Sequence, residues 1–181
     1  MIDIFDATTA PRTSGLLKRT GAVLALSLAG MLGMAGGDAA LASGPFAGMD
    51  GSWSGSGTVS MDSGTKERMR CTAQYLVKDN DNNLQQHLNC SSPSYDFKVN
   101  TYVDHAAGSL SGYWEELKNN VRGSVAGNAK GGRVHVVLKG AAFSAVLDLL
   151  TRGNSQSVTI TPGRDTQTQV QRVAITLRKG G

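Results

Sequence analysis

The sequence has few of the side chains that most often carry catalysis, metal binding or nucleic-acid binding. Its 181 residues include only three histidines and two cysteines, and 6% of them are aromatic. The net charge is +4, but the basic residues are scattered and never form a run of five or more. A nucleic-acid-binding face needs clustered basic residues and aromatic side chains that stack on bases. The sequence therefore predicts no nucleic-acid partner.

The ionisable residues show no arrangement typical of an active site or a metal site. His87 and His135 fall on the polar faces of expected strands, and His105 falls in an expected loop over 104–108. We expect all three at the solvated surface, without a metal. Glu115 and Glu116 are adjacent, so on a strand they point to opposite faces and do not form a catalytic pair. We therefore do not expect an enzyme.

A hydrophobic run long enough to span a bilayer is also missing. The longest apolar stretch, 21–36, is shorter than the ~20 residues that a transmembrane helix needs. It follows the basic pair Lys18-Arg19 and precedes Ala40-Leu41-Ala42, an order typical of a secretory signal peptide. We predict a signal peptide over 1–42, cleaved between Ala42 and Ser43, and one periplasmic or secreted domain over 43–181 that is not a membrane protein after cleavage. A retained membrane anchor is the alternative.

The two cysteines, Cys71 and Cys90, are expected to form a disulfide, because paired cysteines in an exported chain usually do. We expect them directly opposite each other in a hairpin that turns at Asn80-Asp81. Their Cα atoms must then lie less than about 7 Å apart. The same register predicts three further cross-strand pairs, which are Ala73 with Leu88, Tyr75 with Gln86 and Val77 with Leu84.

From residue 51 onward, apolar side chains alternate with polar ones, and turn residues interrupt the pattern at short intervals. This is typical of antiparallel strands in a sandwich or barrel. The segment 141–150 also fits a short helix, but its neighbours favour a strand. We predict an all-β antiparallel meander barrel of about eight to ten strands. The expected strands are 52–61, 66–78, 84–90, 95–103, 110–114, 121–125, 134–138, 141–150, 155–161 and 169–178.

The first strand carries Gly51-x-Trp53-x-Gly55-x-Gly57. This motif resembles the start of calycin-type barrels, and its fuller form is similar to the nitrobindin-like branch of heme-binding barrels. The resemblance implies that Trp53 packs across one end of the barrel beneath a basic residue of the last strand, Arg172 or Arg178. Nitrobindin-like proteins bind heme iron through a histidine near the C-terminal strand, and no histidine follows His135 here. We therefore expect no heme and no other cofactor.

Two functions are consistent with these sequence features. The first is an exported barrel that binds a small apolar or amphipathic molecule, with candidate lining residues Trp53, Tyr75, Tyr95, Phe97 and Trp114. The second is a protein-interaction module similar to the small exported inhibitors of secreted proteases, in which an N-terminal segment enters the protease cleft. A connected interior cavity of several hundred Å³ favours the first function, and a filled barrel with an exposed apolar patch favours the second.

Overall fold

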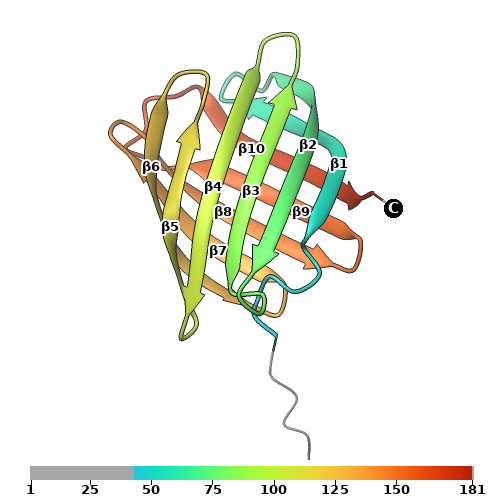
Figure 1. Ribbon diagram of the computed structural model, residues 1–181. Coiled ribbons are helices and arrows are strands. Elements are labelled where there is room, and N and C mark those ends of the chain that lie inside the picture. Colours follow the sequence, from blue (N-terminus) through green and yellow to red (C-terminus); the bar gives the residue numbers. More distant parts are fainter. Residues whose placement is uncertain (1–42, 181) are drawn as a thin grey trace, which may run out of the picture. The chain divides into compact units, whose positions relative to one another are not determined.

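The computed structural model describes residues 43–180, which form ten antiparallel strands and no helix within that range. Each strand pairs with its sequence neighbours, and β10 pairs with β1, so the sheet closes into a barrel (Figure 1). The predicted all-β meander barrel is confirmed, and the predicted signal peptide lies outside the described residues. The strands are β1 (Gly51–Met61), β2 (Lys66–Lys78), β3 (Asn83–Ser91), β4 (Asp96–Ala106), β5 (Ser109–Glu116), β6 (Val121–Lys130), β7 (Arg133–Gly140), β8 (Ser144–Arg152), β9 (Ser155–Pro162) and β10 (Val170–Lys179).

The ambiguous segment 141–150 contributes a strand, β8, and not a helix. β8 forms antiparallel ladders with β7 on one side and with β9 on the other. Ala145 and Leu149 point into the core, while Asp148 between them is exposed. A closed sheet leaves no unpaired strand edge, and the two ladders of β8 keep the sheet continuous at this point.

The hairpin formed by β2 and β3 has the register that the cysteines predict. Cys71 pairs with Cys90, and the two are joined by a disulfide with their Cα atoms 4.1 Å apart. The turn residues Asp79, Asn80 and Asp81 all adopt positive φ angles, as left-handed turn residues do. In the chain-entropy model, a closed loop of this size contributes about 3 kcal/mol to stability. The three further predicted pairs are also present, namely Ala73 with Leu88, Tyr75 with Gln86 and Val77 with Leu84.

The two ends of the barrel carry different connections, because neighbouring strands run in opposite directions. We call one of them the closed end; it carries the N-terminal segment 43–50 and the turns 79–82, 107–108, 131–132 and 153–154. The other, the open end, carries the turns 62–65, 92–95, 117–120, 141–143 and 163–169. The names reflect the burial of the residues at each end, since Phe46 and Met49 are buried at the closed end and Val121 is exposed at the open end.

Two glycines show how tightly the strands approach at inward positions. A Cβ atom on Gly55 of β1 would overlap the backbone carbonyl of Thr176 on β10. A Cβ atom on Gly123 of β6 would overlap the carbonyl of Lys139 on β7 and also meet the Trp114 indole. Glycine is therefore required at both positions for close backbone approach, as is usual where the wall of a small barrel bends.

Candidate ligand-binding cavity

The barrel encloses a cavity of about 430 Å³. Its lining comes from the N-terminal segment and from every strand except β1, and it is mostly aliphatic and aromatic. Protein interiors are normally packed to crystal-like density with few voids larger than a water molecule. An internal space of this size is therefore a feature of the fold that its function should explain. The polar or ionisable lining residues are Tyr75, Gln86, Thr101, Glu116 and Asn119.

The closed end is sealed by the N-terminal segment, which folds across it. Phe46 and Met49 line the cavity and are each only 1% exposed. The backbone amides of Gly44 and Phe46 donate to the carbonyls of Asn80 and Asp81 in the β2–β3 turn. These contacts fix the segment to the barrel, so that the two buried side chains form a floor.

Trp53 supports this floor from below. Its Nε1 donates to the carbonyl oxygen of Met49 at 2.8 Å, and its ring makes an edge-to-face contact with Tyr75. Lys179 of β10 lies over the ring, with its Nζ 5.9 Å from the centroid, and donates to the carbonyl of Gly48. The residue over the tryptophan is thus Lys179, which pairs with Trp53 across the β1–β10 ladder.

The expectation that Arg172 or Arg178 covers Trp53 is wrong. Arg178 pairs with Ser54 and Arg172 pairs with Ser60, and both arginines are exposed. Since side chains alternate along a strand, Arg178 points to the face opposite Lys179, away from the barrel interior. The Gly-x-Trp motif correctly predicted that the tryptophan packs at one end of the barrel. Which basic residue contacts it depends on the register between β1 and β10, and a shift of one residue exchanges Arg178 for Lys179.

A chain of polar groups crosses the interior near the closed end. Gln86 Nε2 donates to the Tyr75 hydroxyl at 3.1 Å, and that hydroxyl donates to Gln156 Oε1 at 2.6 Å. Gln156 Nε2 then donates to Thr151 Oγ1 at 3.2 Å. Burial raises the pKa of Tyr75 far above its usual value, although its two hydrogen bonds oppose the shift, so the hydroxyl stays neutral.

Gln156 was not singled out from the sequence, yet it is the only buried polar residue in the part of the chain that the structure describes. It shares the inward face of β9 with Val158 and Ile160. Gln156 occupies an alternate position of the strand with Val158 and Ile160, and this sequence pattern could have predicted that it points inward. Because an unpaired buried amide is costly, the two hydrogen bonds of Gln156 explain how it is tolerated there.

At the open end, the cavity reaches partly exposed side chains. Phe97, Phe143 and Val121 line it there, and Val121 is 39% exposed. The contrast with the fully buried floor of Phe46 and Met49 indicates the direction of access. A ligand would enter between the turns of the open end.

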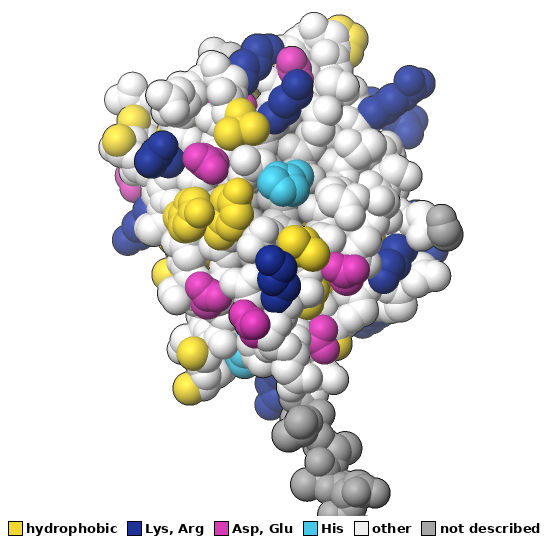
Figure 2. All heavy atoms as spheres, viewed as in Figure 1, with side chains coloured by type: hydrophobic (Ala, Val, Ile, Leu, Met, Phe, Trp, Pro, Cys, Tyr) yellow, Lys and Arg dark blue, Asp and Glu magenta, His cyan; other side chains and the backbone are white. Residues whose placement is uncertain are grey.

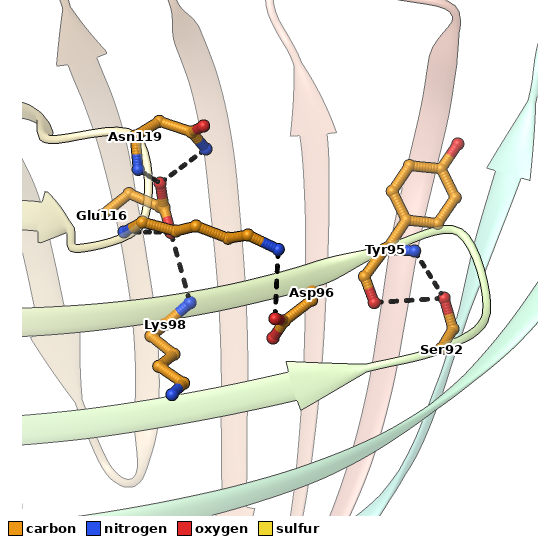
Figure 3. Close-up of polar contacts among 7 residues, drawn as sticks. Ser92, Tyr95, Asp96, Lys98, Glu116 and Asn119 are labelled. Atoms are coloured by element: carbon orange, nitrogen blue, oxygen red, sulfur yellow. Dashed lines mark hydrogen bonds and ion pairs between the residues drawn. The ribbon is translucent and has the colours of Figure 1, made fainter.

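Glu116 and Asn119 add a polar edge to this opening (Figure 3). The Glu116 carboxylate accepts hydrogen bonds from the backbone amides of Lys98, Lys118 and Asn119 and from the Asn119 side chain. Burial raises the pKa of Glu116, but these hydrogen bonds outweigh it and hold the pKa below the usual value for a glutamate. The carboxylate therefore stays ionised and organises the β5–β6 turn.

Trp114 lies against the inner wall next to two glycines. Atoms of its indole are the nearest side-chain neighbours of a Cβ atom built on Gly123 or on Gly140. Its ring makes an edge-to-face contact with Phe143, with centroids 5.7 Å apart. Trp114 is 8% exposed, and its Nε1 has no hydrogen-bond partner among residues 43–180. The glycines thus make room for the indole, which leaves the centre of the barrel free.

Three of the five aromatic residues predicted to line a ligand site do line the cavity, namely Tyr75, Phe97 and Trp114. Trp53 and Tyr95 do not. Trp53 lies behind the floor, in contact with Met49 and Tyr75. Tyr95 lies just before β4, and its hydroxyl donates to the Met61 sulfur at 3.2 Å. Trp53 is buried in the core, and Tyr95 is partly buried against it.

No histidine lines the cavity, so its wall lacks the residue type through which nitrobindin-like barrels hold heme iron. His87 and His135 are exposed on β3 and β7, where their Nδ1 atoms contact Asn100 and Asp148. The expected loop position of His105 is wrong, since it lies within β4 and contacts Asn82. Within residues 43–180, no three His, Cys, Asp or Glu residues come together as a metal site.

Comparison of the sequence with models of protein families and with curated proteins finds no match. In the described part of the chain, no helix has the length and hydrophobicity needed to cross a membrane. The class of protein is therefore defined by the molecule itself. It is a closed ten-stranded meander barrel with one disulfide and an apolar cavity that is sealed at one end.

Proposed function

We propose that this protein binds a small apolar or amphipathic molecule inside its barrel, without transforming it. The observation that carries the proposal is the cavity of about 430 Å³ with a mostly apolar lining. Small-molecule sites typically have volumes of about 300–1,000 Å³ and a few polar groups within an apolar wall. The disulfide agrees with an oxidising, extracytoplasmic compartment, which supports the signal-peptide prediction. The first-strand motif supports a place among calycin-like barrels.

The alternative of a protease-inhibitor-like module has less support. In such a module the N-terminal segment would have to project into a partner, whereas here Phe46 and Met49 are buried in the barrel. On the face over β3, β4 and β5, apolar side chains lie in small separate groups among charged ones (Figure 2). That distribution differs from the large contiguous apolar patch expected of a protein-docking surface.

The test is a titration with a fluorescent apolar probe, N-phenyl-1-naphthylamine, against the wild-type protein and two matched variants. Val136 lines the cavity, and Val137, the next residue of β7, points to the opposite face. Val136→Phe should narrow the cavity and weaken probe binding, whereas Val137→Phe should leave probe binding unchanged.

Saturable one-to-one binding that only Val136→Phe weakens supports the proposal. Absence of binding to the folded wild-type protein would overturn it, and so would equal binding to both variants. Circular dichroism of each variant checks that the barrel is folded. A loss of binding by a folded variant then cannot come from unfolding.

A further inference from the structure

The cavity has a distinctive distribution of charge. Among residues 43–180, no lysine, arginine or histidine lines it, and the one carboxylate that does, Glu116, lies at the open end. Hydrogen bonds from three backbone amides and from Asn119 hold this carboxylate ionised. A ligand that enters through the open end therefore passes a negative charge and finds no positive one.

Four basic side chains on the strands and the turn around Glu116 lie outside the barrel. Lys98, Arg122 and Lys139 are exposed at positions that alternate with inward-facing residues of β4, β6 and β7. Lys118 forms an ion pair with Asp96 at 3.1 Å, and both side chains are about half exposed. None of these four side chains lines the cavity, so none is placed to receive an anionic group within it.

The interior nevertheless carries polar groups, and they lie in one row of the sheet. Tyr75 pairs with Gln86, Gln86 pairs with Thr101, and Thr101 pairs with Trp114 across β2, β3, β4 and β5. All four line the cavity. The row presents two hydroxyls and an amide, whereas the Trp114 Nε1 is itself buried and lies against the wall beside Gly123. These are uncharged donors and acceptors, which suit an uncharged polar group.

We propose that the barrel selects ligands whose polar group is uncharged, such as an alcohol, an ester or an amide on an apolar skeleton, and that it discriminates against the corresponding carboxylates. This inference rests on the proposed function. An ionised carboxylate taken into an apolar site loses its hydration, and without a positive partner nothing restores that free energy. An uncharged polar group loses much less and can form hydrogen bonds with the row of Gln86 and Thr101.

The first experiment displaces the fluorescent probe with ligands that share a chain and differ only in the polar group. 1-Dodecanol should displace the probe at least about tenfold more effectively than dodecanoate at pH 7.5. Displacement by neither compound from a protein that binds the probe would overturn the inference, and so would stronger displacement by dodecanoate; in both cases the proposed function stands. Absence of probe binding is the separate result that refutes the proposed function.

The second experiment adds a positive charge at the open end. Val121 lines the cavity there and is 39% exposed, whereas Leu117, four residues earlier, is 52% exposed and does not line the cavity. Val121→Lys should increase the affinity for dodecanoate about three- to tenfold more than the affinity for dodecanol. Leu117→Lys, the matched control, should change neither. An equal gain for both variants would show general surface attraction and overturn the inference.

The third experiment tests the polar row. Thr101→Val removes the hydroxyl with little change in shape, and Thr72→Val makes the same change on an exposed outward position of β2. Thr101→Val should weaken dodecanol binding about threefold more than it weakens binding of the probe, which is mainly apolar. If Thr101→Val and Thr72→Val behave alike, the row does not contact the ligand's polar group.

Discussion

The two sides of the barrel have the same alternating pattern and differ in how they are filled. On the side of β1 and the start of β2, Trp53, Val59, Met69 and Cys71 are buried and none of them lines the cavity. On the side of β6, β7 and β8, most inward side chains are small or medium in size, and most of them border the cavity. We call these the packed side and the hollow side.

The difference shows that period-two alternation determines the fold but not the filling of the barrel. Glycine has opposite effects on the two sides. At Gly57 of β1, the missing side chain admits Met69 and Ile175, which close the space. At Gly123 and Gly140, it admits Trp114, which then lies along the wall and leaves the centre open. The neighbour that occupies the gap decides whether a glycine closes the interior or opens it.

Of the substitutions that compare the two sides, Trp53→Ala on the packed side should lower the free energy of unfolding most. The change removes a fully buried indole, its hydrogen bond to Met49 and its contact with Lys179. We expect a loss of about 3–5 kcal/mol in the free energy of unfolding. Phe97→Ala, at the partly exposed opening of the cavity, should cost only about 1–2 kcal/mol. Urea denaturation measures both, and equal losses would contradict the division into two sides.

A sharper comparison uses one added methylene on each side. Val59→Ile enlarges a side chain in the packed side, where we expect a loss of about 1 kcal/mol from overpacking. Val136→Ile projects into the cavity, where we expect a gain of about 0.5–1 kcal/mol, because a void is partly filled. The thermal unfolding midpoints of the two variants should therefore move in opposite directions. Shifts of the same sign would show that the two sides are packed alike.

The smallest expected effect concerns the opening of the cavity and depends on pH. The folded-state pKa of Glu116 is below the usual value for a glutamate, so its ionised form stabilises the fold above that usual value. This contribution is lost as the pH falls through the lowered folded-state pKa. Glu116→Gln should cost about 0.5 kcal/mol at pH 7, through weaker hydrogen bonds to the β5–β6 turn.

Near pH 3, the stability difference between the wild-type protein and Glu116→Gln should be smaller than at pH 7. Glu115→Gln, one residue earlier on the opposite face of β5, serves as the control and should show little effect at either pH. Denaturant unfolding at both pH values gives the comparison. A Glu116→Gln cost that does not change with pH would mean that the carboxylate charge does not hold this turn.

The sequence predicted the fold well wherever one local rule decided the outcome. The spacing of Cys71 and Cys90 together with the turn at Asn80-Asp81 determined the register of β2 and β3, because cross-strand pairing leaves little freedom once two partners are known. The segment 141–150 was harder, since a short apolar run fits a helix and a strand equally until its neighbours in the sheet are known.

The candidate site could be predicted only in part. The alternation identified Tyr75, Phe97 and Trp114 as inward residues, and all three line the cavity. It did not show that Trp53 belongs to the floor, because the segment 43–50 covers it through contacts that have no periodicity. Nor could it give the cavity volume, which depends on the shape of the closed barrel and on where Trp114 lies. Lys179 was missed because its place beside Trp53 depends on the register between the first strand and the last.

Methyl NMR of the labelled protein during a titration with 1-dodecanol is the most direct test that the hollow side is the binding site. We expect chemical-shift changes at Val136, Leu147 and Ile160, which line the cavity, and almost none at Val59 on the packed side. The exposed Leu76 and Leu117 act as internal controls for surface binding and should also stay unchanged. Changes confined to the exposed leucines, or spread equally over Val59 and Val136, would contradict a ligand site inside the barrel.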